Sequence, residues 1–560
     1  MLRYVIRDHV RSLTIECVSE NDKRKLNDPN GSEEVPKRQR TEQQCQNKAR
    51  GLTYRVSKLD EFCPHLIDRI VGGEEKRCAT VPACPFLHDV AEYAKRKQAD
   101  IGETCYIYRT KGHCPRGITC RFGKDHLTED GHNLIDEDVK RRWEEDRGNR
   151  ATLNQLQKDV QHLLRKRKYD FEKAAHAVRL AERRIRAERG PDDSDSDRVK
   201  LRPEEIKKID WSNKLYLSPL TTVGNLPFRR ICKEFGADVT CGEMAMAHSL
   251  LKGQPQEWAL VKKHASESIF GVQICGKNEH VMARCAQVLQ ENAEIDFIDI
   301  NLGCPIDWVY EQGSGSGLLR RQRILKSVVN SMVGLMEVPL TVKTRTGVSC
   351  SKSVARELMP MFRDAGVSLI TVHGRSREQR YTRSADWGYI EECAAAASPV
   401  PVFGNGDILS YVDYEAALAK CPTVSGAMIG RGALIKPWIF TEIKERRHID
   451  MTSRERLDML TKYANYGLEH WGSDTKGVET TRRFMLEWLS FLHRYVPVGL
   501  LVRPPQAINQ RPPFYRGRDE LETMMASANC KDWVKISEML LGRVPDGFTF
   551  LPKHKANAWK

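Results

Sequence analysis

The stretch Phe297-Ile298-Asp299-Ile300-Asn301-Leu302-Gly303-Cys304-Pro305 joins an apolar, β-branched run to a cysteine. The run from Phe297 to Ile300 is typical of a buried strand, so Cys304 is expected where that strand ends. A glycine-rich loop, Gly313-Ser314-Gly315-Ser316-Gly317, follows within ten residues. A thiol at such a strand end can serve as an acid or as a nucleophile facing a pocket. A lone cysteine can equally be inert, so its role depends on the neighbouring strands.

Seven further apolar runs of similar length lie between residues 213 and about 440, and helix-like stretches separate them. The eight runs cover residues 215–220, 239–244, 269–275, 297–302, 340–344, 369–373, 400–404 and 426–429. Eight repeats of a strand followed by a helix predict a (β/α)₈ barrel, because each short run suits a buried parallel strand. A doubly wound open sheet, which alternates strands and helices in the same way, is the alternative.

The chain is too long for a single hydrophobic core, and its composition changes along its length. We expect a disordered tail at 1–55, two cysteine–histidine clusters at 56–130, a charged helical segment with an acidic linker at 131–200, the barrel at 205–448 and an all-α domain at 449–560. The tail is polar and poor in aromatic residues, which is typical of disorder. In the last segment Leu457, Leu460 and Tyr463 recur at helical spacing.

The charge of the chain favours an anionic partner. The formal net charge is +15 and the pI is near 9.0, which makes RNA or DNA the first candidates. The seventeen cysteines are unevenly spaced and no secretory signal precedes them. Reduced thiols, some of them bound to metal, are therefore expected rather than disulfides. No apolar stretch is long enough to span a bilayer, so we expect no membrane partner.

Two sets of three cysteines and one histidine follow the tail. The first set is Cys63, Cys78, Cys84 and His88, and the second is Cys105, Cys114, Cys120 and His126. Three thiolates and one imidazole suit tetrahedral Zn²⁺, and a full set of four protein ligands indicates a structural ion. Modules this small cannot bury a sufficient core, so metal binding would supply their folding energy. The sequence therefore predicts two Zn²⁺ sites.

The two sets resemble CCCH zinc fingers, and the resemblance implies binding of single-stranded RNA. The second set departs from the usual pattern, because five residues instead of three separate Cys120 from His126. Basic and aromatic side chains alternate between its ligands, as base stacking beside phosphate contacts requires. These side chains are Tyr106, Tyr108, Arg109, Lys111, Arg116, Arg121 and Phe122. A zinc module that stabilises the fold or binds protein is the alternative.

Polar residues follow most of the predicted strands, at the end where a barrel carries its chemistry. The strand ends are Pro219-Leu220-Thr221, Gln273, Asn301, Lys343 with Arg345, His373 with Arg375, Asn405-Gly406-Asp407 and Gly430-Arg431-Gly432. The last two groups close strands seven and eight, where backbone N–H groups and an arginine commonly hold a phosphate. Gln273, Lys343 and His373 are donors that could address the carbonyls and the N1 region of a flavin.

The stretch around Cys304 resembles the catalytic motif of the dihydrouridine synthases, FMN-dependent enzymes that reduce uridine in tRNA. Five further stretches fit the same family in order: 217–220, 342–347, 372–375, 404–407 and 429–433. The tandem CCCH sets and the C-terminal part from Tyr466 to Lys560 resemble the eukaryotic synthase 3 branch. The resemblance runs from about residue 55 to residue 560. It implies a multidomain chain with two zinc fingers, a TIM barrel and a C-terminal all-α domain that binds RNA.

The resemblance also implies a role for each strand-end residue. FMN would lie against Pro219, Leu220, Thr221, Gln273, Lys343 and His373, with its phosphate at Asn405, Gly406, Asp407, Gly430 and Arg431. NADPH would reduce the flavin and leave before RNA binds. Hydride would pass from flavin N5 to uracil C6 while Cys304 protonates C5, and Asn301, Arg345 and Arg375 would contact the substrate. A general acid must keep its proton, so we expect the pKa of Cys304 to be near normal or raised.

By the same resemblance, the substrate is tRNA, mainly at position 47 of the variable loop, and some mRNAs are compatible with the same reaction. Two other functions stay open: a flavin oxidoreductase of a free pyrimidine, and a non-catalytic RNA-binding adaptor. The predicted fingers and the charge of +15 favour a large RNA substrate. We expect a monomer without an obligate protein partner. The basic cluster Pro36-Lys37-Arg38-Gln39-Arg40 suggests the nucleus and a tRNA substrate suggests the cytoplasm, so both locations are expected.

Overall fold

The computed structural model describes residues 57–74, 77–187, 208–379, 383–501, 510, 512–513 and 515–553. The predicted disordered tail at 1–55 and the acidic linker at 190–197 lie outside these residues. By its contacts the chain divides after Arg50, and every described residue belongs to the second unit, Gly51–Lys560.

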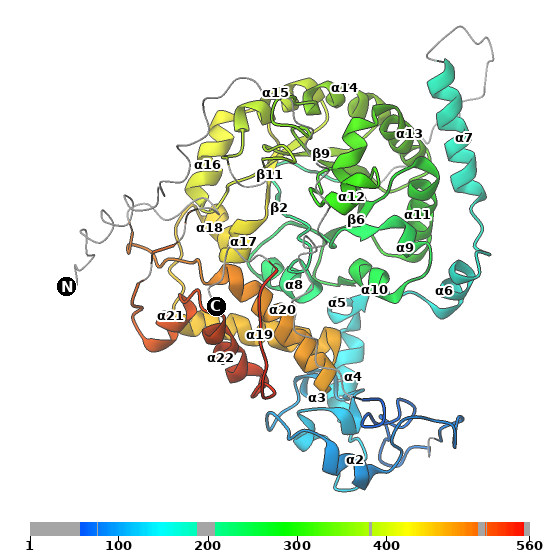
Figure 1. Cartoon of the computed structure of the whole chain (residues 1–560), viewed down its shortest axis with the longest axis vertical. Coiled ribbons are helices and arrows are strands. Elements are labelled where there is room, and N and C mark those ends of the chain that lie inside the picture. Colours follow the sequence, from blue (N-terminus) through cyan, green and yellow to red (C-terminus); the bar gives the residue numbers. More distant parts are fainter. Residues whose placement is uncertain are drawn as a thin grey trace, which may run out of the picture. The chain divides into compact units, whose positions relative to one another are not determined.

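Eight parallel strands close into a barrel, which confirms the predicted fold and excludes the open sheet (Figure 1). They are β2 (Leu215–Leu217), β3 (Val239–Cys241), β6 (Ile269–Cys275), β7 (Phe297–Asn301), β8 (Leu340–Arg345), β9 (Leu369–His373), β10 (Val402–Asn405) and β11 (Gly426–Ile429). Each strand pairs with the next, and β11 pairs with β2 to close the ring. The short strand β4 (Ala245–Met246) adds to β6.

Several strands are shorter than predicted: β3 ends at Cys241 instead of Met244, and β7 ends at Asn301 instead of Leu302. For two further strands, flanking prolines give the reason. β2 ends at Leu217, and Pro219 has no N–H with which to extend the ladder. β10 begins at Val402 instead of Val400, because Pro401 has the same limitation. The strand ends still fall next to the residues that the sequence singled out.

Aromatic side chains fill the end of the barrel opposite the cysteine loop. Trp211 lies edge-on to Phe297 with ring centroids 5.5 Å apart, and Tyr216 and Phe403 belong to the same cluster. Gly271 makes room for this packing, since a Cβ there would lie 2.1 Å from the Phe297 ring. The barrel is therefore a packed core and not a channel.

Helices follow the strands and surround them. The longer ones are α8 (Leu226–Glu234), α11 (Glu279–Asn292), α13 (Gln322–Val333), α14 (Ala355–Ala365), α15 (Trp387–Ala397), α16 (Tyr411–Lys420) and α18 (Ile439–Glu445). The shorter ones are α9 (Ala247–Leu250), α10 (Pro255–Trp258), α12 (Asp307–Glu311), α17 (Arg431–Ile435), and the 3-10 turns η4 (Ala259–Val261) and η5 (Gly315–Arg320). Among the described residues, no helix combines the length and the apolar character that crossing a bilayer requires.

Within the described residues, four helices follow the barrel, in agreement with the predicted all-α character of this region. They are α19 (Ser453–Trp471), α20 (Thr475–Leu492), α21 (Glu520–Met525) and α22 (Cys530–Leu541). A reciprocal capping box of Thr452 and Glu455 begins α19. Trp488 of α20 is buried against Phe228 of α8, and its indole N–H donates to the Leu434 carbonyl over 2.9 Å. This contact fixes α20 against the barrel.

The part before the barrel consists of short elements around the cysteine–histidine sets and a charged helical segment. These elements are α2 (Val90–Arg96), α3 (Tyr106–Lys111), η2 (Gly117–Thr119), η3 (Gly123–Asp125), α4 (Glu137–Glu145), α5 (Arg147–Arg150), α6 (Lys158–Arg165) and α7 (Glu172–Ala187). Strand β1 (Thr152–Leu153) pairs antiparallel with β5 (Lys263–His264). α7 packs against α11 and α13 through Ala174 and Val178, so its apolar stripe is buried on the barrel's helices.

Candidate active site

A cavity of about 290 Å³ opens at the carboxyl ends of the barrel strands. It is lined by all the predicted cofactor residues: Pro219, Leu220, Thr221, Gln273, Lys343, His373, Asn405, Gly406, Asp407, Gly430 and Arg431. Cys304, Asn301 and Arg345 line it as well. Arg375 does not, and it is treated below. The residues that the sequence placed at strand ends therefore meet in one cavity, with a volume near the lower end of ligand pockets, about 300 Å³.

A chain of hydrogen bonds runs from the barrel interior to the cysteine loop. Asp299 accepts from Thr341 Oγ1 over 2.6 Å and from Gln273 Nε2 over 2.7 Å. Gln273 Oε1 in turn accepts from Asn301 Nδ2 over 2.8 Å. Burial raises the pKa of Asp299 to about 6, although its two donors favour the charged form. These hydrogen bonds fix the orientations of the Gln273 and Asn301 amides without any ligand.

Asn301 holds the loop that carries the thiol. Its Oδ1 accepts the backbone N–H of Gly303 over 3.2 Å and of Cys304 over 2.9 Å. Since its amide also donates to Gln273, the side chain is engaged within the protein. The structure therefore supports a positioning role for Asn301, in addition to its place on the cavity wall predicted for substrate contact.

The glycine-rich loop packs directly on Cys304. Ser316 Oγ donates to the Cys304 carbonyl over 2.7 Å. Gly315 has a φ of 56°, and a Cβ there would lie 3.1 Å from Cys304 Cβ, so only glycine suits the position. Cys304 is 9% exposed, and burial raises the pKa of its thiol. The thiol thus retains its proton near neutral pH, as expected of an acid.

Lys343 and His373 present nitrogen atoms at the same cavity. Burial, reinforced by Arg345, lowers the pKa of Lys343 to about 8. Burial and the surrounding cations hold the pKa of His373 well below its ordinary value, so its imidazole is neutral. Nδ1 of His373 is buried and has no hydrogen-bond partner among the described residues. Such an atom costs free energy unless a ligand satisfies it.

Arg345 braces the cysteine loop from the next strand. Its Nε donates to the Gly303 carbonyl over 2.7 Å, and one terminal nitrogen donates to the Ser376 carbonyl over 3.1 Å. Arg345 also lines the cavity, as its predicted substrate contact requires. Its charge lies near both Cys304 and Lys343 and favours an anionic or electron-rich ligand.

The predicted phosphate end lies at the tips of β10 and β11. Asp407 accepts hydrogen bonds from Arg375 over 2.6 and 2.7 Å and from Arg431 over 3.2 Å. The Asp407 carboxylate is thus paired with two arginines. A phosphate would therefore bind to the Asp407 backbone and to the Arg431 guanidinium. Gly406 has a φ of 134°, and a Cβ there would clash with Ala385 at 2.5 Å.

Arg375 is placed differently from its predicted role at the substrate. It is 2% exposed and pairs with Asp407, while its Nε donates to the Arg383 carbonyl over 2.6 Å. These contacts orient Asp407 and the loop after β10. The structure therefore gives Arg375 a supporting position outside the cavity wall.

Sequence analysis missed several residues of the site. Asp299 is a charged residue inside an apolar strand, and it lies two residues before Asn301, so both side chains point to the same face of the strand. This pattern could have identified Asp299 from the sequence. Ser316 was hidden within the glycine-rich loop. Phe491 of α20 also lines the cavity, although it is distant in sequence and looks like an ordinary core residue. Only the fold brings it there.

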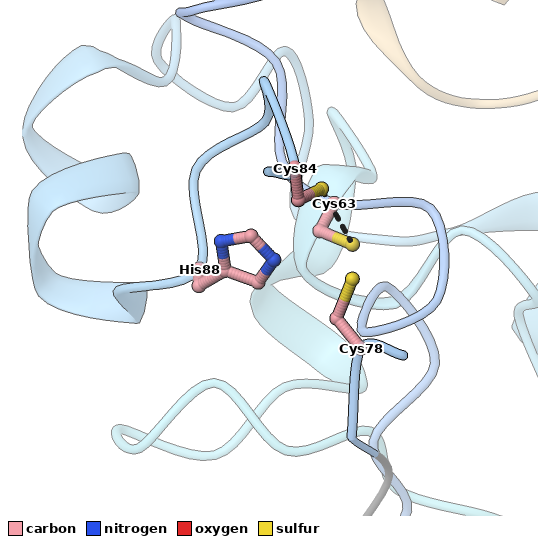
Figure 2. Close-up of side chains that lie close together, drawn as sticks. All are labelled: Cys63, Cys78, Cys84 and His88. Carbon is pink, nitrogen blue, oxygen red and sulfur yellow. Dashed lines mark hydrogen bonds between the residues drawn. The ribbon is translucent and has the colours of Figure 1, made fainter. Parts of the chain in front are cut away.

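The structure brings together each predicted set of metal ligands. In the first cluster, Cys63, Cys78, Cys84 and His88 place their ligand atoms within 4.8 Å of one another (Figure 2). The second cluster, Cys105, Cys114, Cys120 and His126, meets the same limit and is wholly buried. Nε2 of His88 and of His126 is buried without a hydrogen-bond partner among the described residues. His126 Nδ1 lies 2.9 Å from Asn133 Oδ1, which leaves Nε2 to face the sulfurs.

The second cluster is docked against the loop between α19 and α20. Ser473 Oγ lies 3.2 Å from Cys120 Sγ, and the Ser473 carbonyl accepts the Arg121 N–H over 2.9 Å. Lys111 pairs with Glu469 over 2.7 Å, and the Arg121 guanidinium is buried against the Ala99 carbonyl. Of these two predicted RNA contacts, Lys111 therefore docks the module on α19, whereas the Arg121 guanidinium is held inside the module.

Comparison with known proteins shows which protein family the chain resembles. A family model described as dihydrouridine synthase (Dus) matches residues 216–492. A Xenopus tropicalis protein named tRNA-dihydrouridine(47) synthase NAD(P)(+)-like is 52% identical over 539 residues, covering 92% of this chain and 83% of that protein. The human protein of the same name is 52% identical and covers 90% and 82%. A Cryptococcus neoformans protein named tRNA-dihydrouridine(47) synthase is 41% identical over 578 residues, covering 88% and 77%. This chain belongs to the dihydrouridine synthase family.

Proposed function

We propose that this chain reduces uridine to 5,6-dihydrouridine in tRNA, at position 47 as the names of its relatives indicate, with FMN as cofactor and NADPH as reductant. The observation that carries the proposal is Cys304, whose proton-retaining thiol lines a cavity shared with Lys343, His373 and Gln273. A cysteine protease would need a thiolate instead. Family membership and this thiol point to the same chemistry.

The residues of the cavity fit FMN. The unpartnered Nδ1 of His373 and the partly buried Lys343 suit a ring with polar edges, and Arg431 with the backbone at Gly406 and Gly430 suits a phosphate. Bound FMN would supply the hydride that adds to C6 of uracil. The protein's part is to hold that ring and exclude water from it.

Cys304 acts as the proton donor in this proposal. Its Sγ gives a proton to C5 of uracil, and the resulting thiolate regains a proton from solvent. Overall, uridine gains one hydride and one proton, and NADPH becomes NADP⁺. Asn301, Ser316 and Arg345 keep the thiol in place through the loop contacts described above. C5 and C6 are covered in a stacked base, so the uridine must leave its stack to reach the cavity.

The two clusters would each hold a structural Zn²⁺. Three sulfurs and one free imidazole nitrogen within 4.8 Å suit its tetrahedral geometry. The fingers and the helices α19 to α22 would hold the body of the RNA, for which the excess of basic residues provides the charge.

The test uses the full chain with NADPH and an unmodified tRNA transcript. Wild type should be yellow and form dihydrouridine, and Cys304→Ala should form it about 10²- to 10⁴-fold more slowly while still oxidising NADPH, the usual range for a lost general acid. Cys350→Ala, which removes an exposed thiol, is the matched control and should behave as wild type. A colourless protein that binds tRNA would support an adaptor instead. Reduction of free uridine but not of tRNA would support a small-molecule oxidoreductase.

A further inference from the structure

Helix α12 presents an exposed aromatic side chain beside the cavity. Trp308 is 55% exposed, and it is the one tryptophan among the exposed large apolar residues of the described chain. Ile306, two residues earlier, is 49% exposed and also lines the cavity. Both follow Cys304 within four residues. Ile306 and Trp308 thus expose two large apolar side chains on one short segment, and the first of them lines the cavity.

The position of this helix is fixed from its inner side. Val309 is buried and packs with Cys304 and Cys275. The Tyr310 ring is covered by the Arg377 guanidinium, whose carbon lies 3.9 Å from the ring centroid, and Arg377 also pairs with Asp307. Trp308 therefore stands on a braced helix while its neighbours hold that helix to the loop of Cys304.

Helix α12 carries the acidic residues Asp307 and Glu311, and two arginines, Arg320 and Arg377, contact it. Arg320 donates to the Tyr310 hydroxyl over 2.9 Å, and Arg321 and Arg323 are exposed at the start of α13. The charge of Asp307 on α12 is matched by Arg377. An aromatic face with arginines beside it suits an unstacked nucleotide, whose base stacks while its phosphates meet the guanidinium groups.

We propose that Trp308 is a stacking platform for the nucleotide next to the uridine that enters the cavity. The inference rests on the proposed function. When the target base leaves its stack, its neighbour loses a stacking partner, and an indole within four residues of the acid can replace that partner. The occupant is RNA and not a second copy of the chain, because a tryptophan and an isoleucine are far smaller than the roughly 1,000 Å² of a stable protein interface.

The test measures stacking and turnover separately on the full chain loaded with FMN. Transcripts carry 2-aminopurine on the 5′ or the 3′ side of the target uridine. Wild type should quench one of the two probes on binding, Trp308→Ala should not, and Trp308→Phe should restore part of the quenching. With natural tRNA, KM should rise about 5- to 150-fold in Trp308→Ala and kcat should change less, as expected for one lost base stack.

Controls separate this inference from the proposed function. Val412→Ala removes a similarly exposed apolar side chain on α16 and should match wild type. NADPH oxidation without RNA should be equal in all variants, and its loss in Trp308→Ala would overturn the inference in favour of a structural role. Equal KM and equal quenching in Trp308→Ala and Val412→Ala would overturn it too, as would a dimer that only Trp308→Ala dissociates. A wild type that forms no dihydrouridine would instead refute the proposed function.

Discussion

The second cluster and the hydrogen-bonded residues that hold the loop of Cys304 are both buried groups of thiol and polar side chains, but only the group around Cys304 is satisfied without a ligand. In the barrel mouth, Thr341, Gln273 and Asn301 satisfy Asp299 and one another, and the loop of Cys304 is fixed. In the second cluster, three sulfurs converge on a buried His126 Nε2 that has no partner among the described residues. Hydrogen bonds hold the first arrangement, whereas the second has the ligand set of the Zn²⁺ site proposed above. This difference is what we expect between a preorganised proton donor, as proposed for Cys304, and thiols proposed to bind a structural metal ion.

The largest expected effect comes from breaking the second cluster. Cys120→Ser removes one ligand, so the free energy that a structural zinc contributes to folding, about 10–16 kcal/mol in isolated fingers, is largely lost there. We expect residues 105–126 to lose protection from hydrogen exchange and tRNA affinity to fall, while NADPH oxidation in the barrel persists. Metal content, hydrogen exchange and tRNA binding check this.

Cys350→Ser is the control, since Cys350 is exposed and belongs to neither cluster. Chelation of the wild type should reproduce the Cys120→Ser result. Unchanged protection of residues 105–126 after metal removal would contradict the view that this module depends on a cation.

The next effect comes from opening the hydrogen-bonded chain in the barrel mouth. Asp299→Ala leaves the donors of Gln273 and Thr341 without their buried acceptor, at about 1–3 kcal/mol each. We expect a lower Tm and weaker retention of flavin, because Gln273 loses its orientation. Asp364→Ala, at an exposed carboxylate of α14, is the matched control. A Tm equal to that of the control would show that these hydrogen bonds are not needed to stabilise the carboxyl end of the barrel.

Sequence alone predicted the barrel and most of the cavity because both have local signals. Strand runs such as Ile269–Cys275 are apolar apart from the site residue Gln273, and polar residues at strand ends must meet in a parallel barrel. Phe491 could not be predicted, since its place at the cavity depends on how α20 packs through Trp488. The role of Arg375 was also not predictable, since its position at a strand end suggests substrate contact and does not reveal its ion pair with Asp407.

The same limit applies to the second cluster. The spacing of Cys105, Cys114, Cys120 and His126 predicted convergence, and the structure shows it. The spacing did not predict that the cluster would pack against Ser473, because Ser473 lies far along the chain and belongs to no recognisable motif. As a result Lys111 and Arg121, which look like RNA contacts in sequence, have partners inside the protein.

The smallest expected effect is the response of the acid to pH, and it tests the contrast between the two kinds of thiol directly. A proton donor works while protonated, so its step slows as the pH rises through its pKa. Burial raises the pKa of Cys304 above the ordinary value of about 9, whereas the pKa of Lys343 is lowered to about 8. The single-turnover rate of dihydrouridine formation should therefore change less than about twofold from pH 6 to 8.5 and fall only above pH 9.

The rate is measured with prereduced enzyme and saturating tRNA. A fall in rate centred near pH 8 would assign the proton to Lys343 and contradict Cys304 as the donor. A flat profile to pH 9 would show that the same residue type, which must ionise to hold a metal in the cluster, keeps its proton in the barrel mouth because burial there is not offset by a cation ligand.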